Sequence, residues 1–251
     1  MFKAKIENAR LWKNLLSAIS TLIEEADFNT SEDGIKLRAM DPSHVAMVDF
    51  TLEKKAFDEY HCDKSVSIRI NIDSMLRLLR RIKSNETLEL AFNEDTKKMI
   101  LTLKEKITKQ FTIPTLNPTG EQVPTPKVTF NCKIKMAIGG LKEIMEDVQA
   151  VSDHVKLEAK ENKLLVSASS ELSSANIEVD KQSDILLDTE FKESAIATYN
   201  LNYLTEMVKA GSALSETATV EFSTNMPIKI EFEISQKGKL AYYLAPRIEV
   251  E

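Results

Sequence analysis

A cluster of arginines on one predicted helix has the spacing best suited to a chemical role, and that role is contact with phosphate. Arg77, Arg80 and Arg81 stand at positions i, i+3 and i+4, so in a helix they share one face with no acid among them. Lys83 follows just beyond. A solvated helix face explains an isolated cation well but explains three close arginines poorly. We expect this face to contact nucleic-acid phosphates without reading bases.

Motifs for catalysis and for base recognition are missing from the sequence. It contains no GxxxxGK(S/T) phosphate loop, no GxGxxG, no HExxH and no GxSxG. The histidines, His44, His61 and His154, are scattered, and no spacing singles out a pair of carboxylates. Zinc-finger spacing, a helix-turn-helix and an aromatic platform for single strands are also missing. We therefore expect no enzyme activity, no metal and no cofactor.

The composition predicts a globular protein inside the cell. The chain has 251 residues, 43% hydrophobic and 29% charged, which suffices for a sizeable core and argues against disorder. Its apolar stretches fall short of the roughly 18 residues that a membrane helix needs. The N-terminal MFKAKIENAR has no signal-peptide core. Two cysteines outside any motif, Cys62 and Cys132, indicate a reduced chain, although one disulfide stays possible.

The net charge of −6, taken alone, argues against nucleic-acid binding. However, the Debye length at physiological salt is about 8 Å, so acids on one face hardly cancel bases on another. The placement of the lysines and arginines therefore matters more than their sum.

The chain repeats itself at a spacing of 129 residues. The segment IRINIDSMLRLL (68–79) matches ATYNLNYLTEMV (197–208), which pairs Asn71 with Asn200. In each half a strand, turn and strand follow, and the opening FKAKIENARLWKNLLSAI has its counterpart in TFNCKIKMAIGGLKEIMEDV. Identity is low, so the repeat depends on the matched order of elements.

Hydrophobic periodicity predicts four amphipathic helices among many short alternating strands. The first helix has an apolar stripe of Leu11, Leu15, Ala18, Ile19 and Leu22. On the helix with the arginines, Leu76 and Leu79 are expected to point towards a sheet. The fold class is therefore α+β, with large antiparallel sheets and two helices on one face in each half.

A proline-rich connector separates the two halves. Residues 114–126 hold four of the seven prolines, which rules out a helix or a central strand there. We expect a first domain at 1–113, the connector at 114–126 and a second domain at 127–251. The apolar Val123 among the prolines suggests that the connector also packs on the protein.

Several stretches resemble the proliferating cell nuclear antigen (PCNA) family of DNA sliding clamps, with a likeness nearer to archaeal members. LRAMDPSHVAMVDF (37–50) resembles the segment after the first helix of these clamps, and LAYYLAPRIEVE (240–251) resembles their C-terminus. The resemblance covers essentially the whole chain. It implies two similar clamp domains per subunit and a trimeric ring around duplex DNA, with helices lining the hole and sheets forming the outer wall.

The resemblance implies the residues of the DNA channel. They are Lys13, Arg77, Arg80, Arg81, Lys83, Lys142 and Lys209. Glu143 and Glu146 depart from the family, which often carries bases on the third helix. We therefore expect the second domain to hold DNA more weakly than the first.

The resemblance also implies a pocket for partner peptides that carry the PCNA-interacting motif. The matching residues are Met40, His44, Val45, Met47, Val123, Pro126, Met226, Pro227, Tyr243, Leu244, Ala245 and Pro246. Methionines suit a pocket with many ligands, since their side chains repack easily. Thr125 stands where an aliphatic residue is common, so one wall is expected to be more polar. Taken alone, Val45 is better explained as a core residue, and His44 equally well as a structural one.

The subunit interface is expected where an edge strand of one first domain meets an edge strand of the next second domain. The matching strands are Thr108–Ile113, with Lys109, Phe111 and Ile113 on one face, and Ala175–Val179, with Ala175, Ile177 and Val179. Ordinary internal strands are the alternative.

The expected partners follow from the resemblance. They are double-stranded DNA without sequence preference, DNA polymerase, a clamp loader, flap endonuclease, DNA ligase and further copies of this chain, with no membrane. The expected location is with the DNA, in the cytoplasm or nucleoid of an archaeon or the nucleus of a eukaryote. Alternatives are a subunit of a heterotrimeric or checkpoint-type clamp, a hydrolase of unfamiliar type, and a monomeric peptide-binding scaffold.

Overall fold

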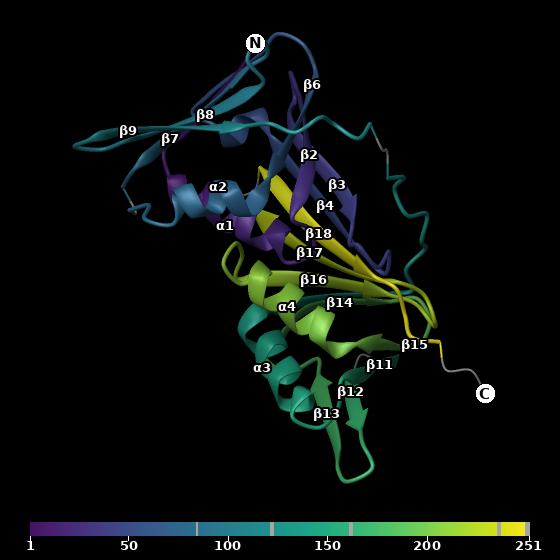
Figure 1. The fold of residues 1–251 in the computed structure, drawn as a ribbon. Helices are drawn as coiled ribbons and strands as arrows, with labels where there is room; N and C mark the ends of the chain where they lie inside the picture. The colour runs from purple at the N-terminus through teal and green to yellow at the C-terminus, as the bar shows by residue number, and fades with distance from the viewer. Residues whose placement is uncertain (84, 121–122, 161–162, 235–236, 249–251) are drawn as a thin grey trace. The chain divides into compact units, whose positions relative to one another are not determined.

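The chain folds into two compact units that are not continuous in sequence. The computed structural model describes residues 1–83, 85–120, 123–160, 163–234 and 237–248. The first unit comprises Met1–Pro42, Val48–Val123 and Ile234–Leu240, and the second comprises Ser43–Met47, Pro124–Glu233 and Ala241–Glu251. Figure 1 shows the elements of each unit along the chain.

In its described residues, the first unit contains two α-helices, a short 3-10 turn and the nine strands named below. Its elements are β1 (Phe2–Ile6), α1 (Ala9–Ser20), β2 (Glu25–Ser31), β3 (Gly34–Met40), β4 (Ala46–Glu53), η1 (Lys54–Ala56), β5 (Glu59–Cys62), β6 (Val66–Asn71), α2 (Ile72–Leu79), β7 (Thr87–Asn93), β8 (Lys98–Lys104) and β9 (Thr108–Pro114). They form an antiparallel sheet of order β5-β1-β7-β8-β9 and the run β4-β3-β2-β6.

The second unit repeats this order of elements. Its elements are β10 (Cys132–Ala137), α3 (Ile138–Gln149), β11 (His154–Lys160), β12 (Lys163–Ser169), β13 (Ser174–Asp180), β14 (Leu186–Phe191), β15 (Ala195–Asn200), α4 (Leu201–Gly211), β16 (Thr217–Phe222), β17 (Ile228–Ile234) and β18 (Gly238–Leu244). They form an antiparallel sheet of order β13-β12-β11-β15 and the run β14-β10-β16-β17. The unit boundary falls within β4, at the last residue of β17 and within β18.

Matching contacts show that the repeat predicted from the sequence is structural. Asn71 and Asn200 each cap a helix, accepting a backbone N–H three residues later at 2.8 Å and 3.2 Å. The start of the first helix is tied in the same way in each unit: the Ala9 N–H donates to the Glu86 carbonyl, and the Ile138 N–H to the Glu216 carbonyl. The predicted α+β class is confirmed, with four helices in the described part of the chain.

The cores lie between the helices and the sheets of each unit. In the first unit, Trp12 of α1 and Met75 of α2 line a small interior gap together with Phe28, Ile68 and Leu90 from the strands. In the second unit, Leu141 and Leu204 of the helices meet Leu157, Val220 and Ile230 in the same way. The alternating strands thus turn every second side chain towards the helices.

Two details of the predicted helix stripes are wrong. On α1, Leu11 is only half-buried, whereas Trp12 and Leu16 are fully buried. On α2, Met75 is buried and Leu76 is half-buried, so Met75 with Leu79 faces the core. Strict spacing of aliphatic residues missed Trp12 and Met75 because an indole and a thioether fill core space as well as leucine does.

The first part of the proline-rich connector packs on the first unit. The Leu116 N–H donates to the Arg69 carbonyl at 2.8 Å, and the Thr119 hydroxyl donates to Asp27 at 2.8 Å. Arg38, held by Asp49 at 2.7 Å, donates to the Val123 carbonyl at 3.3 Å. Residues 121–122 of the predicted connector lie outside the described residues. The domain limits at 113/114 and 126/127 stay predictions.

Candidate functional site

The side chains of the arginine cluster are exposed, and the three residues lie in the last turn of α2, at its C-cap and in the turn that follows. Arg77 lies in the last turn of α2 and donates to the Ser74 hydroxyl at 2.9 Å. Arg80 is the C-cap of α2 with helical backbone angles, and Arg81 stands in the turn that follows. The predicted helix therefore ends before the cluster does. Among the described residues, none forms an ion pair with these three guanidinium groups.

The other predicted channel lysines differ in how their charge is used. Lys13 lies half-buried on α1, with no carboxylate in ion-pair range among the described residues. Lys83 lies 3.5 Å from Glu105. In the second unit Lys142 lies 3.6 Å from Glu146, and Lys209 lies 3.6 Å from Glu206. Those two lysines therefore have less free positive charge to offer a phosphate than the arginines have.

Strand β9, the first predicted interface strand, lies at an edge of the five-stranded sheet of its unit. Lys109 and Phe111 are half-buried and Ile113 is buried, whereas the residues between them are exposed. The predicted interface residues therefore lie on the less exposed face of β9. An edge strand offers unpaired backbone groups to another chain.

The Lys109 ammonium already has a partner, the buried carboxylate of Glu86, which is only 1% exposed. Burial raises the pKa of Glu86, but Lys109 and the Lys83 backbone N–H outweigh it and hold the pKa below the ordinary glutamate value.

Strand β13, the second predicted interface strand, likewise lies at an edge of the four-stranded sheet of its unit. Its burial pattern is the same as that of β9, with Ala175 and Ile177 half-buried and Val179 buried. The two strands thus share the features expected of complementary edges, although their pairing stays a prediction.

Part of the predicted partner surface is exposed in the second unit. Val45 is 38% exposed and Met226 is 39% exposed, so Val45 is a surface residue rather than a core one. His44 is exposed with a positive φ of 57°, a conformation that histidine adopts more readily than branched residues do. The Val45 carbonyl accepts the Ala245 N–H at 2.8 Å, which joins this turn to the end of β18.

A buried tyrosine holds Met226 in place. The Tyr199 hydroxyl donates to the Met226 carbonyl at 2.8 Å, and burial raises the pKa of this phenol. Pro227 follows Met226 half-buried, and Pro126, Tyr243 and Pro246 are half-buried too.

The remaining predicted pocket residues are distributed between surface and core. Ala245 is exposed, whereas Met47 and Leu244 are 3% and 2% exposed and pack in the protein's own interior. A ligand could reach these two only as the floor of a pocket. Met40 and Val123 belong to the first unit and are half-buried there.

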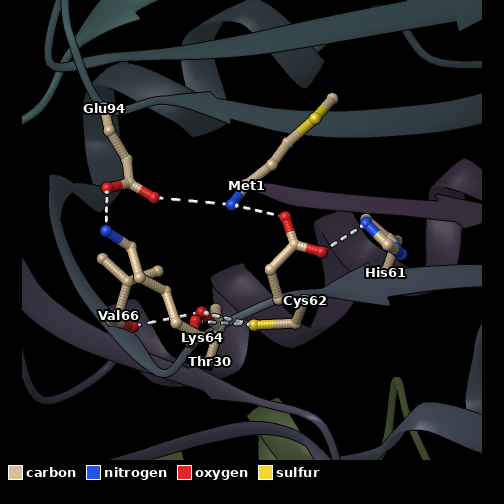
Figure 2. Close-up of polar contacts among 8 residues, drawn as sticks. Met1, Thr30, His61, Cys62, Lys64, Val66 and Glu94 are labelled. Carbon is tan, nitrogen blue, oxygen red and sulfur yellow. Dashed lines mark hydrogen bonds and ion pairs between the residues drawn. The ribbon is translucent and has the colours of Figure 1, made fainter.

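An exposed group of ion pairs ties the start of β1 to the end of β5. The Met1 ammonium lies 3.0 Å from Asp63 and 3.5 Å from Glu94, and the Lys64 ammonium lies 2.7 Å from Glu94. Figure 2 shows Met1 and Lys64 both directed towards Glu94. His61 lies 2.7 Å from Asp63. The hydrogen bonds lower the pKa of Asp63 and of Glu94 and raise the pKa of Lys64. These contacts fasten strand ends, and nothing in the group resembles a substrate site.

Reactive side chains are few. Both cysteines are free, and burial raises the pKa of Cys132 to about 12, so it stays a thiol. No helix in the described residues is long and apolar enough to cross a membrane. Within the same residues, no three histidine, cysteine or carboxylate side chains gather as metal ligands.

Sequence reasoning missed a polar pocket of about 370 Å³ in the second unit. It is lined by residues of four strands, by Ser152 before β11 and by Arg247 beyond β18, and His154 and Lys156 lie in it. The signal lies in the alternation of β11 and β12, whose outward positions carry lysine, histidine and serine, but only the strand register brings them together.

Comparison with known proteins gives matches over nearly the whole chain. The models for the proliferating cell nuclear antigen N-terminal and C-terminal domains match residues 1–117 and 124–247. The DNA polymerase sliding clamp 1 of Pyrobaculum aerophilum is 34% identical over 242 residues, which is 96% of either chain. The DNA polymerase sliding clamp of Cenarchaeum symbiosum is 32% identical and covers 98% of either chain.

A solved structure shares the fold. The crystal structure of PCNA from Thermococcus kodakaraensis superposes with a TM-score of 0.93, and the match covers 98% of this chain and all of that one. The sequences are 24% identical, so this likeness supports the architecture and carries no residue assignments.

Proposed function

Because the chain belongs to the proliferating cell nuclear antigen family of DNA polymerase sliding clamps, we propose that it acts as a trimeric ring that encircles duplex DNA. The family is non-enzymatic, so the protein's contribution is to keep other enzymes on DNA. The ring tethers DNA polymerase and so raises its processivity. Its place of action is with the DNA inside the cell.

The observation that carries this proposal is the exposed arginine cluster at the end of α2. Arg77, Arg80 and Arg81 have no acidic partner among the described residues, although the protein as a whole carries a net charge of −6. Free guanidinium groups on an acidic protein suit contact with a phosphate backbone. Three copies in a ring would create a positive bore through which DNA can slide, because phosphate contacts carry no sequence information.

Ring closure is proposed to use β9 and β13. Both are edge strands with the same alternation of exposed and half-buried residues. Pairing β9 of one subunit with β13 of the next is a heterologous contact, which gives a closed ring when the rotation closes. Lys109, Phe111, Ile113, Ala175, Ile177 and Val179 are the residues proposed for this interface.

Partner binding is proposed to use the exposed residues around Val45, Met226 and Ala245. Their exposed apolar side chains and the nearby prolines suit a short peptide with apolar anchors. DNA polymerase, flap endonuclease and DNA ligase would dock there by PCNA-interacting peptides. Opening the ring requires an outside ATPase, because the sequence has no phosphate loop, and so a clamp loader is a further proposed partner.

Primer extension on a long circular template tests the proposal. With polymerase and clamp loader present, adding this protein should lengthen the products from single binding events. Unchanged product length with a ring shown to be loaded on the template would overturn the proposal. Degradation of DNA by the purified chain alone would favour a hydrolase instead.

The mass of the purified chain in solution tests the form of the ring. A homotrimer should have three times the 28.3 kDa of the chain. A chain that stays monomeric until other clamp subunits are added would instead support a subunit of a heterotrimeric or checkpoint-type ring.

A further inference from the structure

A row of polar side chains runs across the sheet through the polar pocket of the second unit. Antiparallel register pairs Thr198 with Lys156, Lys156 with Ser167, and Ser167 with Asn176. An isolated bridge joins Thr198 to Arg247, whose N–H donates to the Thr198 carbonyl at 2.7 Å. Residues paired in this way point to the same face of the sheet, so five neighbouring segments present one polar row.

This pocket is positively charged. Two positions along β11 from Lys156, His154 belongs to the same face and adds a ring nitrogen that can donate. Among the described residues, no carboxylate lines the pocket and none forms an ion pair with Lys156 or Arg247. The hydroxyls of Ser167 and Thr198 supply further donors. The pocket therefore offers charged and neutral donors to an oxyanion.

Carboxylates on this face stand beyond the pocket. Glu158 lies two positions along β11 from Lys156, and Glu178 lies two positions along β13 from Asn176. Glu178 forms an ion pair with Lys163, so its charge is already matched. Apolar surface is also scarce, since Ala168 is the one apolar residue in the described part of the lining. These features suit a charged ligand rather than an apolar one.

The pocket lies on the face of its sheet that turns away from the helices of its unit. Val155, Leu157 and Val166 alternate with the pocket residues and are buried on the side of α3 and α4. Figure 1 shows both helices on one side of β11, β12 and β13. Phosphates of a duplex that touched α3 and α4 would therefore be separated from the pocket by the thickness of the sheet.

The proposed partner surface continues directly into the pocket. The Ala245 N–H donates to the Val45 carbonyl, and Arg247 stands two residues further along the segment that follows β18. Two extended residues span about 7 Å. A peptide docked on Val45, Met226 and Ala245 would therefore bring its flanking residues to Arg247 and Lys156.

From this geometry, and resting on the proposed partner surface, we propose that Lys156 and Arg247, assisted by His154, bind an acidic segment that flanks the docking peptide of a partner protein. Carboxylate groups of aspartate or glutamate accept charge-assisted hydrogen bonds from the guanidinium and ammonium groups. The remainder of the acidic protein surface repels such a segment, so the pocket selects partners by charge. Partners without an acidic flank bind by the apolar anchors alone.

Peptide binding measured by fluorescence anisotropy at about 50 mM salt tests the proposal, because low salt leaves exposed charges least screened. Three peptides are compared on the intact trimer: a docking peptide, and the same peptide with three aspartates added before or after it. We expect one extended peptide to bind about tenfold more tightly than the plain one. The double variant Lys156→Gln with Arg247→Gln should remove that gain and leave the affinity for the plain peptide unchanged.

Lys163→Gln is the matched control, since it removes a lysine from the same sheet face, four positions along β12 from Ser167. It should leave most of the gain in place. Failure of the plain peptide to bind would remove the partner surface on which the inference rests. Binding of the plain peptide with no gain from either extension would overturn the inference alone. A fall in affinity for linear duplex DNA in the double variant, as large as the fall for the acidic peptide, would also overturn it.

Discussion

The helix pairs of the two units share one backbone arrangement but carry opposite charge. In the first unit, α1 and the end of α2 offer Lys13, Arg77, Arg80 and Arg81 without acidic partners among the described residues. In the second, α3 carries three acids and one lysine, and that lysine and Lys209 of α4 both lie beside glutamates. Two units with the same fold therefore need not contribute equally to DNA binding. The buried faces of the helices determine the fold, whereas their exposed faces carry the charge.

The units also differ at one buried carboxylate. Glu86 and Glu216 occupy matching places, since the carbonyl of each accepts the first N–H of the first helix in its unit. Glu86 is 1% exposed and paired with Lys109, whereas Glu216 is exposed. A repeat can therefore keep a backbone contact while the side chain at that place changes from a buried ionic partner to a solvated group.

Removing cations from the first helix pair should weaken DNA binding far more than removing them from the second. The double variant Arg77→Ala with Arg80→Ala should bind short linear duplex about a hundredfold more weakly at low salt, because a ring loses this pair in every subunit. Lys142→Ala with Lys209→Ala should lose no more than about threefold, since both lysines are already beside acids. Anisotropy titrations over a range of salt concentration would measure both, with a shallower salt dependence for the arginine variant.

The mass of the arginine variant in solution is the control for that comparison. A trimer would show that only DNA contact has changed. Dissociation into monomers would place these arginines at a subunit interface, and equal losses in the two double variants would remove the charge difference between the units.

The next effect concerns the buried carboxylate. Glu86→Gln should lower the free energy of unfolding by about 1–2 kcal/mol at neutral pH, because Lys109 loses a buried ionic partner. Glu216→Gln at the matching place should change it by less than about 0.5 kcal/mol. Denaturant unfolding monitored by circular dichroism would measure both, with ring mass checked in parallel.

The ion pair between Glu86 and Lys109 also predicts how the stability of the protein changes with pH. The folded-state pKa of Glu86 lies below its ordinary value of 4.5. The stabilisation is therefore fully present above pH 4.5 and is lost as the pH falls through the folded-state pKa. The difference in free energy of unfolding between the wild-type protein and Glu86→Gln should shrink on acidification. A difference that stayed constant with pH would show that the ion pair does not cause it.

Substitutions that give α3 more positive charge should have a smaller effect, in the opposite direction. Glu143→Lys with Glu146→Lys removes two acids from α3 and the carboxylate beside Lys142. Affinity for linear duplex should rise about fivefold, which corresponds to about 1 kcal/mol. The same titrations would measure it, and an unchanged affinity would mean that α3 does not face the DNA.

Much of the fold could be predicted because it is encoded in local patterns. Asn71 and Asn200 each stand before an amphipathic helix, and their capping bonds followed the predicted repeat. The buried sides of α1 and α2 were harder, since Trp12 and Met75 fill places that aliphatic spacing gave to Leu11 and Leu76. Val45 was harder still, because an isolated valine does not reveal whether a turn exposes it.

The class of fold, the internal repeat and the likeness to clamps could be recognised without a structure, because periodicity, caps and short motifs depend on neighbouring residues. Tertiary structure alone decided which cations keep their charge free and which are paired, as with Lys109 on Glu86. It also decided that Lys156, Ser167, Thr198 and Arg247 meet in one pocket, because strand register joins residues that are far apart along the chain.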